Sequence, residues 1–193
     1  MDVSKSERLR LEPLPDGELI RLVRERDEAA FEALVRRYED RVFRLAVRVL
    51  GDRDEARDVG QEVFIGIWEN PGAYRPRAEF GTWLYRVVFN RALNRQRILR
   101  VKAFLSLSSL TSRDEPPVST SDLPDRGLER DEKVSRLARE LDRLPPRQRA
   151  ALHLRYREGL SVDEVAAVLK VSRRAAEGLI FRGKQTLRER LKD

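Results

Sequence analysis

Aromatic, amide and guanidinium side chains recur at helical spacing in the middle of the chain. If this stretch is a helix, one of its faces presents Trp83, Arg86, Asn90, Asn94 and Arg97. Amides read base edges, aromatic rings stack on unpaired bases, and arginines neutralise phosphates. The face therefore favours nucleic acid with exposed bases. The alternative is a basic amphipathic helix with Trp83 in the core, and this stretch alone leaves the two interpretations equally open.

A second group of side chains near the C-terminus is typical of DNA reading. Ser161 and Glu164 form a capping box at the start of one short helix, and Ser172 caps the next. Two capped helices joined by a tight turn, the second one basic, indicate a helix-turn-helix, with a generic helical hairpin as the alternative. Lys170 stands in the turn, where glycine would adopt a left-handed conformation more easily. The expected DNA-facing residues are Ser172, Arg173, Arg174, Glu177, Gly178, Phe181, Arg182 and Lys184.

A third group lies on an acidic helix that follows Gly51. An acidic face would repel DNA but suits a basic protein surface. The alternative is an ordinary solvated face with the aromatic side chains in the core, and spacing alone favours that alternative. The candidate protein-binding residues are Asp58, Gln61, Glu62, Phe64, Ile65 and Trp68.

The same carboxylates could suggest acid–base catalysis, but the sequence lacks the groups that would accompany it. No nucleophile, metal-ligand cluster or glycine-rich phosphate loop stands beside them, so we do not expect an enzyme. His153 lies between two leucines without partner ligands in the sequence, which favours a structural role. The chain has no cysteine, which excludes disulfides and thiolate zinc sites. We therefore expect no metal and no cofactor.

Composition agrees with a polyanionic partner without requiring one. The chain has 193 residues, a net charge of +7 and 38% charged residues, which also fits a solvated helical surface. Its length allows one large or two small domains. No apolar run is long enough to span a bilayer, and Met1–Arg10 lacks an apolar signal core. We therefore expect a cytoplasmic location.

Apolar periodicity predicts an all-α protein, because no alternating strand pattern of useful length occurs. We expect N-caps at Asp16, at Asp27 and at Asp52 or Asp54, and a C-cap at Gly51. The expected divisions are a tail at 1–15, a domain at 16–102, a flexible linker at 103–128 and a second helical domain at 129–193. The linker composition, rich in Ser, Thr, Pro and Asp, would span roughly 30 Å as a coil and roughly 90 Å fully extended.

Five segments recur in a definite order along the chain: Asp27–Phe31 with Tyr38, Asp58–Phe64, Phe80–Asn90, Leu144–Arg149 and Glu158–Ser161. In this order they resemble one family, the bacterial RNA polymerase sigma factors of the extracytoplasmic function (ECF) group. The joint order and spacing make the resemblance specific, and it covers nearly everything except the tail and the linker.

The resemblance implies a role for each constellation. Residues 16–102 would be a region 2-like domain whose acidic helix docks on the clamp helices of the polymerase largest subunit. Residues 129–193 would be a region 4-like domain that reads the minus-thirty-five element and contacts the polymerase flap, and the linker would thread toward the active-site cleft. An anti-sigma protein is a further implied partner. The face around Trp83 would work at the melted minus-ten element, with added contacts from Tyr74, Arg75 and Phe80, and the loop Tyr74–Glu79 would hold a flipped base.

The sequence also departs from the family pattern at three positions. Gly60 replaces a bulkier residue, and a mid-helix glycine costs about 1 kcal/mol relative to alanine. Glu177 and Gly178 replace a basic residue and a serine; a glutamate can accept from cytosine N4 but repels phosphate. Two rival functions remain: a free-standing helix-turn-helix regulator, and a helical adaptor or anti-sigma partner without a DNA role. The first leaves the acidic helix and the Trp83 face unexplained, and the second leaves the basic helix unexplained.

Overall fold

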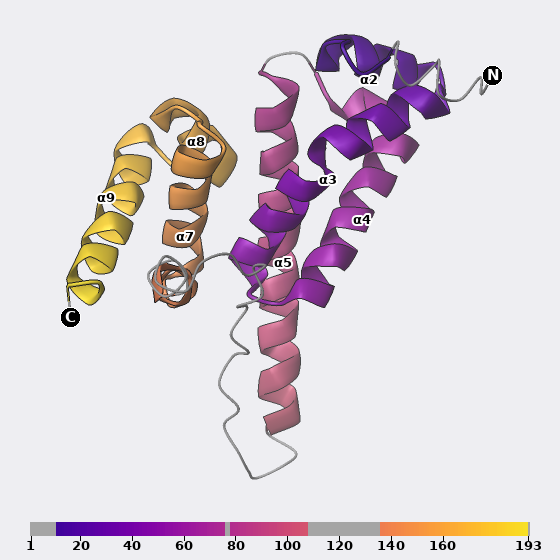
Figure 1. The fold of residues 1–193 in the computed structure, drawn as a ribbon. Helices are drawn as coiled ribbons and strands as arrows, with labels where there is room; N and C mark the ends of the chain where they lie inside the picture. Colours follow the sequence, from indigo (N-terminus) through magenta and orange to yellow (C-terminus); the bar gives the residue numbers. More distant parts are fainter. Residues whose placement is uncertain (1–10, 76–77, 108–135, 193) are drawn as a thin grey trace, which may run out of the picture.

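The computed structural model describes residues 11–75, 78–107 and 136–192, and every regular element in those segments is helical. The expected all-α fold is therefore confirmed. Figure 1 shows the elements in chain order, and a further helix at 136–142 precedes α7. The elements are α2 Asp16–Arg24, α3 Glu28–Leu50, α4 Arg53–Glu69, the 3-10 turn η1 Pro71–Ala73, α5 Phe80–Leu107, α7 Pro146–Leu152, the π-helical turn η2 His153–Arg157, α8 Val162–Leu169 and α9 Arg173–Arg190.

Side-chain caps begin α3, α4, α8 and α9. Asp27 accepts from the Ala30 amide at 2.9 Å, and Asp52 accepts from two amides of the first turn of α4. Gly51 ends α3 with φ 77°, a left-handed conformation that glycine adopts at little cost. The expected cap at Asp16 is wrong, because Asp16 lies inside α2 and its carboxylate instead accepts from Arg37 and Tyr38 of α3.

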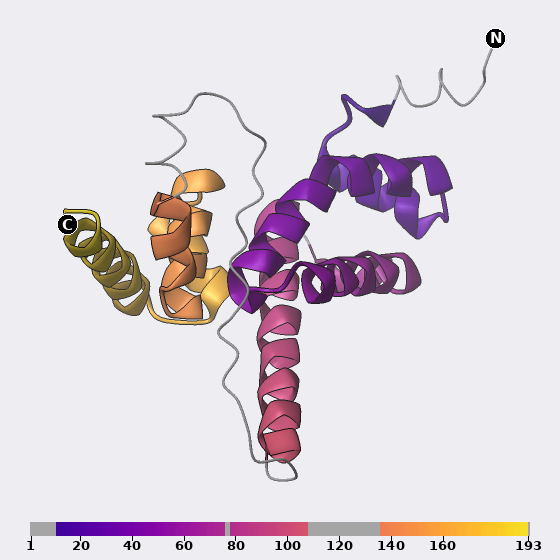
Figure 2. The same ribbon diagram turned by 60° about the horizontal axis from the view of Figure 1, so that its bottom comes forward.

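The N-terminal helices share one core. α3 packs against α2, α4 and α5, and all four contribute fully buried side chains, among them Leu19, Leu45, Val59 and Leu84. Residues expected in the tail extend this core, because Leu11 and Leu14 pack against it. α5 ends at Leu107 rather than near Lys102, and its second half projects beyond the bundle (Figures 1 and 2).

The C-terminal helices form a second, smaller cluster in which α9 packs on α7 and α8. α7 ends at Leu152, and a π-helical turn, His153–Arg157, follows it without a break. In that turn the Glu158 amide donates to the His153 carbonyl at 3.2 Å, one residue farther back than in an α-helix. Gly159 then leaves the turn with φ 74°.

The two clusters touch each other. α8 contacts α5 and α7 contacts α3, so the C-terminal helices lie against the side of the N-terminal bundle (Figures 1 and 2). The sequence predicted two modules separated by a linker and gave no sign of this contact. Most of that linker lies outside the described residues. Within the described segments, no helix is both long enough and apolar enough to cross a membrane.

Candidate functional site

The α5 face predicted to bind nucleic acid is largely open to solvent. Arg86, Asn94 and Arg97 are exposed, and Asn90 is half-buried. Trp83 is also half-buried and packs against the core, so it lies between the two interpretations left open by its spacing. α5 therefore presents guanidinium and amide groups along one side, with an indole ring at the N-terminal end of that side.

An aromatic cluster supports this end of α5 from within. The Trp83 ring lies 5.4 Å from Tyr74 and 5.6 Å from Phe80, and Phe80 in turn meets Tyr38 edge to face at 5.5 Å. Tyr74 and Phe80 are only 6% and 2% exposed. In this conformation both rings are buried and hold Trp83 and the loop before α5, so a contact of either ring with DNA stays a prediction and requires them to become exposed.

The loop that precedes α5 is tied to the bundle at its first residue. Tyr74 Oη donates to the Ala78 carbonyl at 2.9 Å, and Arg24 Nη2 donates to the Tyr74 carbonyl at 2.7 Å. Arg75 is exposed, as a DNA-contacting residue requires. Residues 76–77 of the expected base-holding loop lie outside the described residues.

The acidic helix α4 is partly neutralised by α5. Asp58, Gln61 and Ile65 are exposed, but Glu62 forms ion pairs with Arg95 and, at 3.5 Å, with Arg91. These half-exposed, charge-assisted contacts link α4 to α5. Glu62 is thus not a freely presented charge, although its side chain is 44% exposed, and its part in protein binding stays a prediction. Asp58 remains the exposed carboxylate at the centre of the acidic face.

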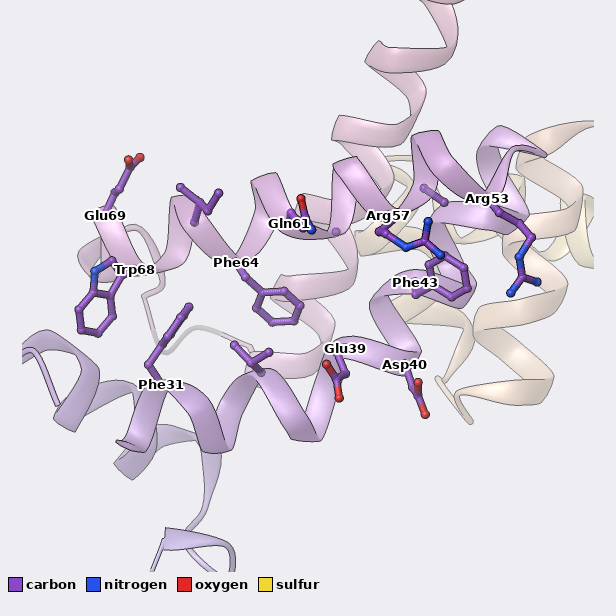
Figure 3. A pocket seen from close by; sticks show the side chains of 14 residues that line it. Phe31, Glu39, Asp40, Phe43, Arg53, Arg57, Gln61, Phe64, Trp68 and Glu69 are labelled. Carbon is purple, nitrogen blue, oxygen red and sulfur yellow. The ribbon is translucent and has the colours of Figure 1, made fainter. Parts of the chain in front are cut away.

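Beside that face, a groove of about 710 Å³ opens between α3 and α4. Figure 3 shows Phe64 and Trp68 of α4 pointing toward α3, where Phe31 and Phe43 complete an aromatic lining. Trp68 meets Phe31 at 5.0 Å, rather than stacking on Phe64. Charged side chains lie along the rim of the groove: Glu39, Asp40, Arg53, Arg57 and Glu69.

The sequence indicated the α4 side of this groove but not the α3 side. Phe64 and Trp68 were recognised on α4, but Phe31 was noted only as part of a family-like segment and Phe43 carried no prediction. Both are only partly buried, and they face α4 across the helix pair. Phe31, Val35 and Phe43 stand at multiples of four residues, and the i±4n positions of a helix form one ridge on its surface, which is a usable signal.

The helix-turn-helix has the local geometry that its sequence predicted. Ser161 and Glu164 form the full capping box, and Ser172 accepts from the Ala175 amide at 3.2 Å. Lys170 adopts φ 53°, so the turn does require a left-handed residue. The turn is closed by the Val171 amide, which donates to the Ala166 carbonyl at 3.0 Å.

The outer face of α9 is polar and open. Arg173 bonds to Asp163 at 2.9 Å and to Glu177 at 3.2 Å, so that its guanidinium is oriented by two carboxylates. These pairs raise the pKa of Arg173 above its ordinary value. Phe181 is 69% exposed, and Lys184 lies over the Tyr156 ring at 5.6 Å. The other candidates on this helix are partly or fully exposed: Ser172, Arg174, Gly178 and Arg182.

His153 takes part in a structural contact. Its Nε2 lies 3.3 Å from the Glu158 carboxylate, and both side chains are almost fully buried. Among the described residues, no group of three or more metal-ligating side chains occurs. The geometry of His153 is that of a buried polar pair.

Comparison with protein families matches both halves of the chain. The model described as "Sigma-70 region 2" matches residues 34–100, which contain α4 and the candidate nucleic-acid face of α5. The model described as "Sigma-70, region 4" matches residues 135–187, which contain the helix-turn-helix.

Relatives and solved structures extend the match to nearly the whole chain. The RNA polymerase sigma-H factor of Pseudomonas aeruginosa is 32% identical over 89% of this chain and 91% of its own. The ECF RNA polymerase sigma factor SigW of Bacillus subtilis is 29% identical over 90% and 95%. The solved structure of CnrH with the cytosolic domain of CnrY is 25% identical, covers 92% and 97%, and has a TM-score of 0.65. These matches show that the chain belongs to the ECF group of the sigma-70 family, whose members are transcription initiation factors.

Proposed function

We propose that this chain binds core RNA polymerase and directs it to a subset of promoters, with catalysis left to the polymerase. The observation that carries the proposal is that one chain has two exposed surfaces whose side chains suit different forms of DNA. α5 offers amide, guanidinium and indole groups suited to opened DNA, and α9 offers a capped, polar helix suited to duplex. A protein that only reads duplex operators has no use for the first surface.

At the minus-ten element, Trp83, Arg86 and Asn90 would capture bases of the opened strand. Each opened step loses about 1.4 kcal/mol of stacking. Capture of a base on an aromatic surface or in a pocket returns about 1–3 kcal/mol. Asn94, Arg97 and the exposed Arg75 would hold the flanking phosphates. A few captured bases can therefore keep a short bubble open once a larger partner clamps the protein.

At the minus-thirty-five element, the N-terminal half of α9 would enter the major groove. Recognition helices of this kind contact bases with residues near their N-terminus. Arg174 and Glu177 stand there with exposed side chains, and Glu177 can accept from cytosine N4. Because Glu177 also bonds to Arg173, the pair presents a donor and an acceptor side by side.

Polymerase would dock on α4 and the groove beside it. Asp58, Gln61 and Ile65 are exposed on α4, and Phe64 and Trp68 line the groove. An apolar lining with charged rims suits an amphipathic helical partner, which fits the clamp helices that the family resemblance implies. An anti-sigma protein that blocks polymerase binding is the third partner we propose; the co-crystal structure of the sigma factor RpoE from Bartonella quintana, which has the same fold, contains the anti-sigma factor NepR.

Run-off transcription on genomic fragments tests the proposal directly. Purified core polymerase should initiate at discrete sites only when the chain is added, and the two should co-elute in gel filtration. The competing function, a free-standing helix-turn-helix regulator, requires tight duplex binding by the chain alone and no co-elution. That result would overturn the proposal.

A further inference from the structure

Arg26 has a backbone conformation that an arginine rarely adopts. It lies between α2 and α3 with φ 67°, in the left-handed region, where a residue with a Cβ carries a steric cost that glycine does not. In the part of the chain that the structure describes, Lys170 of the helix-turn-helix is the one other non-glycine residue with a positive φ. A strained conformation of this kind points to a use for the side chain at that position.

Hydrogen bonds at the end of α2 hold Arg26 in this conformation. The Arg26 amide donates to the Val23 carbonyl at 3.0 Å. The Asp27 amide donates to the Leu22 carbonyl at 3.1 Å. These two bonds form a Schellman motif, whose first residue beyond the helix cap is left-handed and is most often glycine. Because Asp27 is also the N-cap of α3, the backbone is held on both sides, and glycine at position 26 would relieve the strain.

The Arg26 side chain reaches the C-terminal end of α4. Its Nη1 atom donates to the Trp68 carbonyl at 2.7 Å. The last carbonyls of an α-helix have no partner within the helix, and a positive charge beside them complements the helix dipole. The last turn of α4 contains no basic residue of its own. Arg26 therefore supplies, from the link between α2 and α3, the cation that this end of α4 lacks.

The same guanidinium also contacts the Trp68 ring. Arg26 Cζ lies 5.4 Å from the centroid of the indole, within the range of a cation–π interaction. Phe31 of α3 meets the indole at 5.0 Å between ring centroids, with the two planes tilted by 47°. The carbonyl and the ring of Trp68 are thus both held by Arg26, and Phe31 provides a second contact with the ring.

Trp68 and Phe31 form one end of the groove between α3 and α4, and Arg53 lies at the other end (Figure 3). Arg26 itself lies outside the lining of the groove, so it can act there only through Trp68. An indole that is free to rotate about its side-chain bonds must be ordered when a partner binds, and that ordering opposes binding. An indole that is already held makes this end of the groove preorganised.

We propose that Arg26 is a positioning residue for the groove, and that its guanidinium holds the Trp68 indole in the orientation that a helical partner meets. The benefit for polymerase binding rests on the proposed function, whereas the hold on the ring does not. Glycine at position 26 would relieve the backbone but release the indole. Stability and polymerase binding should therefore change independently at this residue.

Glycine substitutions at the two left-handed positions separate these effects. Lys170→Gly is the matched control for Arg26→Gly, because the exposed Lys170 side chain makes no hydrogen bond or ion pair with the described residues. Neither variant should unfold at a lower urea concentration than wild type. Arg26→Gly should weaken binding to core polymerase by about 2- to 10-fold, the cost of ordering one large side chain. Lys170→Gly should leave binding unchanged, and Arg26→Lys, which keeps a cation near the ring, should restore part of the loss.

Fluorine NMR of protein labelled with fluorotryptophan reports on the ring itself. The chain has two tryptophans, Trp68 and Trp83, so two signals are expected, and Trp83→Phe assigns them. Arg26→Gly should shift or broaden the Trp68 signal and leave the Trp83 signal in place. Lys170→Gly should move neither signal.

An unmoved Trp68 signal in Arg26→Gly would overturn the positioning role. A moved signal together with wild-type affinity for polymerase would overturn its use in binding. If Arg26→Gly lowers the urea midpoint, Arg26→Lys decides: binding closer to wild type than that of Arg26→Gly supports the role, and equally weak binding overturns it. A wild-type chain that fails to bind polymerase would instead refute the proposed function, while the Trp68 signal would still decide whether Arg26 holds the ring.

Discussion

Two buried glycines, Gly60 in α4 and Gly183 in α9, should respond in opposite ways to the same substitution. A Cβ placed on Gly60 would lie 3.6 Å from Val42 Cγ1, an ordinary van der Waals distance. A Cβ on Gly183 would lie 2.9 Å from Leu152 Cδ1 and 3.2 Å from Leu152 Cγ. We expect Gly60→Ala to stabilise the fold and Gly183→Ala to destabilise it.

The magnitudes follow from helix propensity and packing. Alanine in place of a mid-helix glycine gains about 1 kcal/mol, and the space beside Gly60 imposes no opposing cost. At Gly183 the same gain meets an overpacking cost of about 1–3 kcal/mol, because both the end and the branch point of Leu152 are too close to move apart by a simple rotation. The net change at Gly183 is then a loss of up to about 2 kcal/mol.

Urea and thermal unfolding of the three proteins measure these changes. A gain of about 1 kcal/mol corresponds to an increase in Tm of about 2–4 °C for a chain of this size. Because Gly60 lines the proposed polymerase groove, binding to core polymerase should be measured alongside stability. If Gly60→Ala destabilises the protein, or if both alanines stabilise it equally, the packing described around these positions is wrong.

Three further predictions concern the proposed sites. Asp58→Lys should weaken binding to core polymerase in a pull-down without loss of stability, whereas Glu62→Lys should also lower the unfolding midpoint because it breaks ion pairs with α5. Asn90→Ala should reduce the permanganate reactivity of promoter thymines while closed-complex band shifts stay near normal. Arg174→Ala should instead weaken recruitment to the promoter by about 1–3 kcal/mol if its side chain contacts a base. If both variants fail at the same step, α5 and α9 do not have separate roles. Burial opposes ionisation of Glu158, but hydrogen bonds from its neighbours lower its pKa to about 2, below the ordinary 4.5. The contact that Glu158 makes with Tyr85 of α5 should therefore be complete above about pH 4.5 and weaken as the pH falls toward 2. Energy transfer between dyes placed on α4 and α9 measures this, and an unchanged transfer across that range would contradict it.

Local features were predictable from the sequence because local chemistry determines them. Asp27, Gly51 and Ser172 act as caps through atoms within four residues, so residue type and spacing are sufficient. The capping box of α8 and the left-handed turn after it are equally local. Exposure of the candidate residues on α9 followed from helical periodicity alone.

Features that depend on distant contacts could not be predicted in this way. Tyr74 and Phe80 have side chains that suit both base stacking and a core, and only the packing of α3 against α5 decides for the core. Glu62 looked like an exposed acid because Arg95, its partner, stands on another helix. The hydrogen bonds that Arg149 donates to the Arg48 and Val49 carbonyls leave no periodic signal in the sequence, because these carbonyls lie about a hundred residues earlier.

The π-helical turn at His153–Arg157 determines how the chain after it is rotated about the axis of α7. An α-helix advances about 100° per residue, so the one extra residue accommodated by a π turn rotates the downstream chain by about that angle relative to α7. Glu158 comes immediately after the turn and meets Tyr85 at this phase. Deletion of one residue within the turn would restore α-helical winding and direct the carboxylate away from α5. The angle between the helix-turn-helix and the rest of the chain is thus encoded in five residues that lie outside the helix-turn-helix itself.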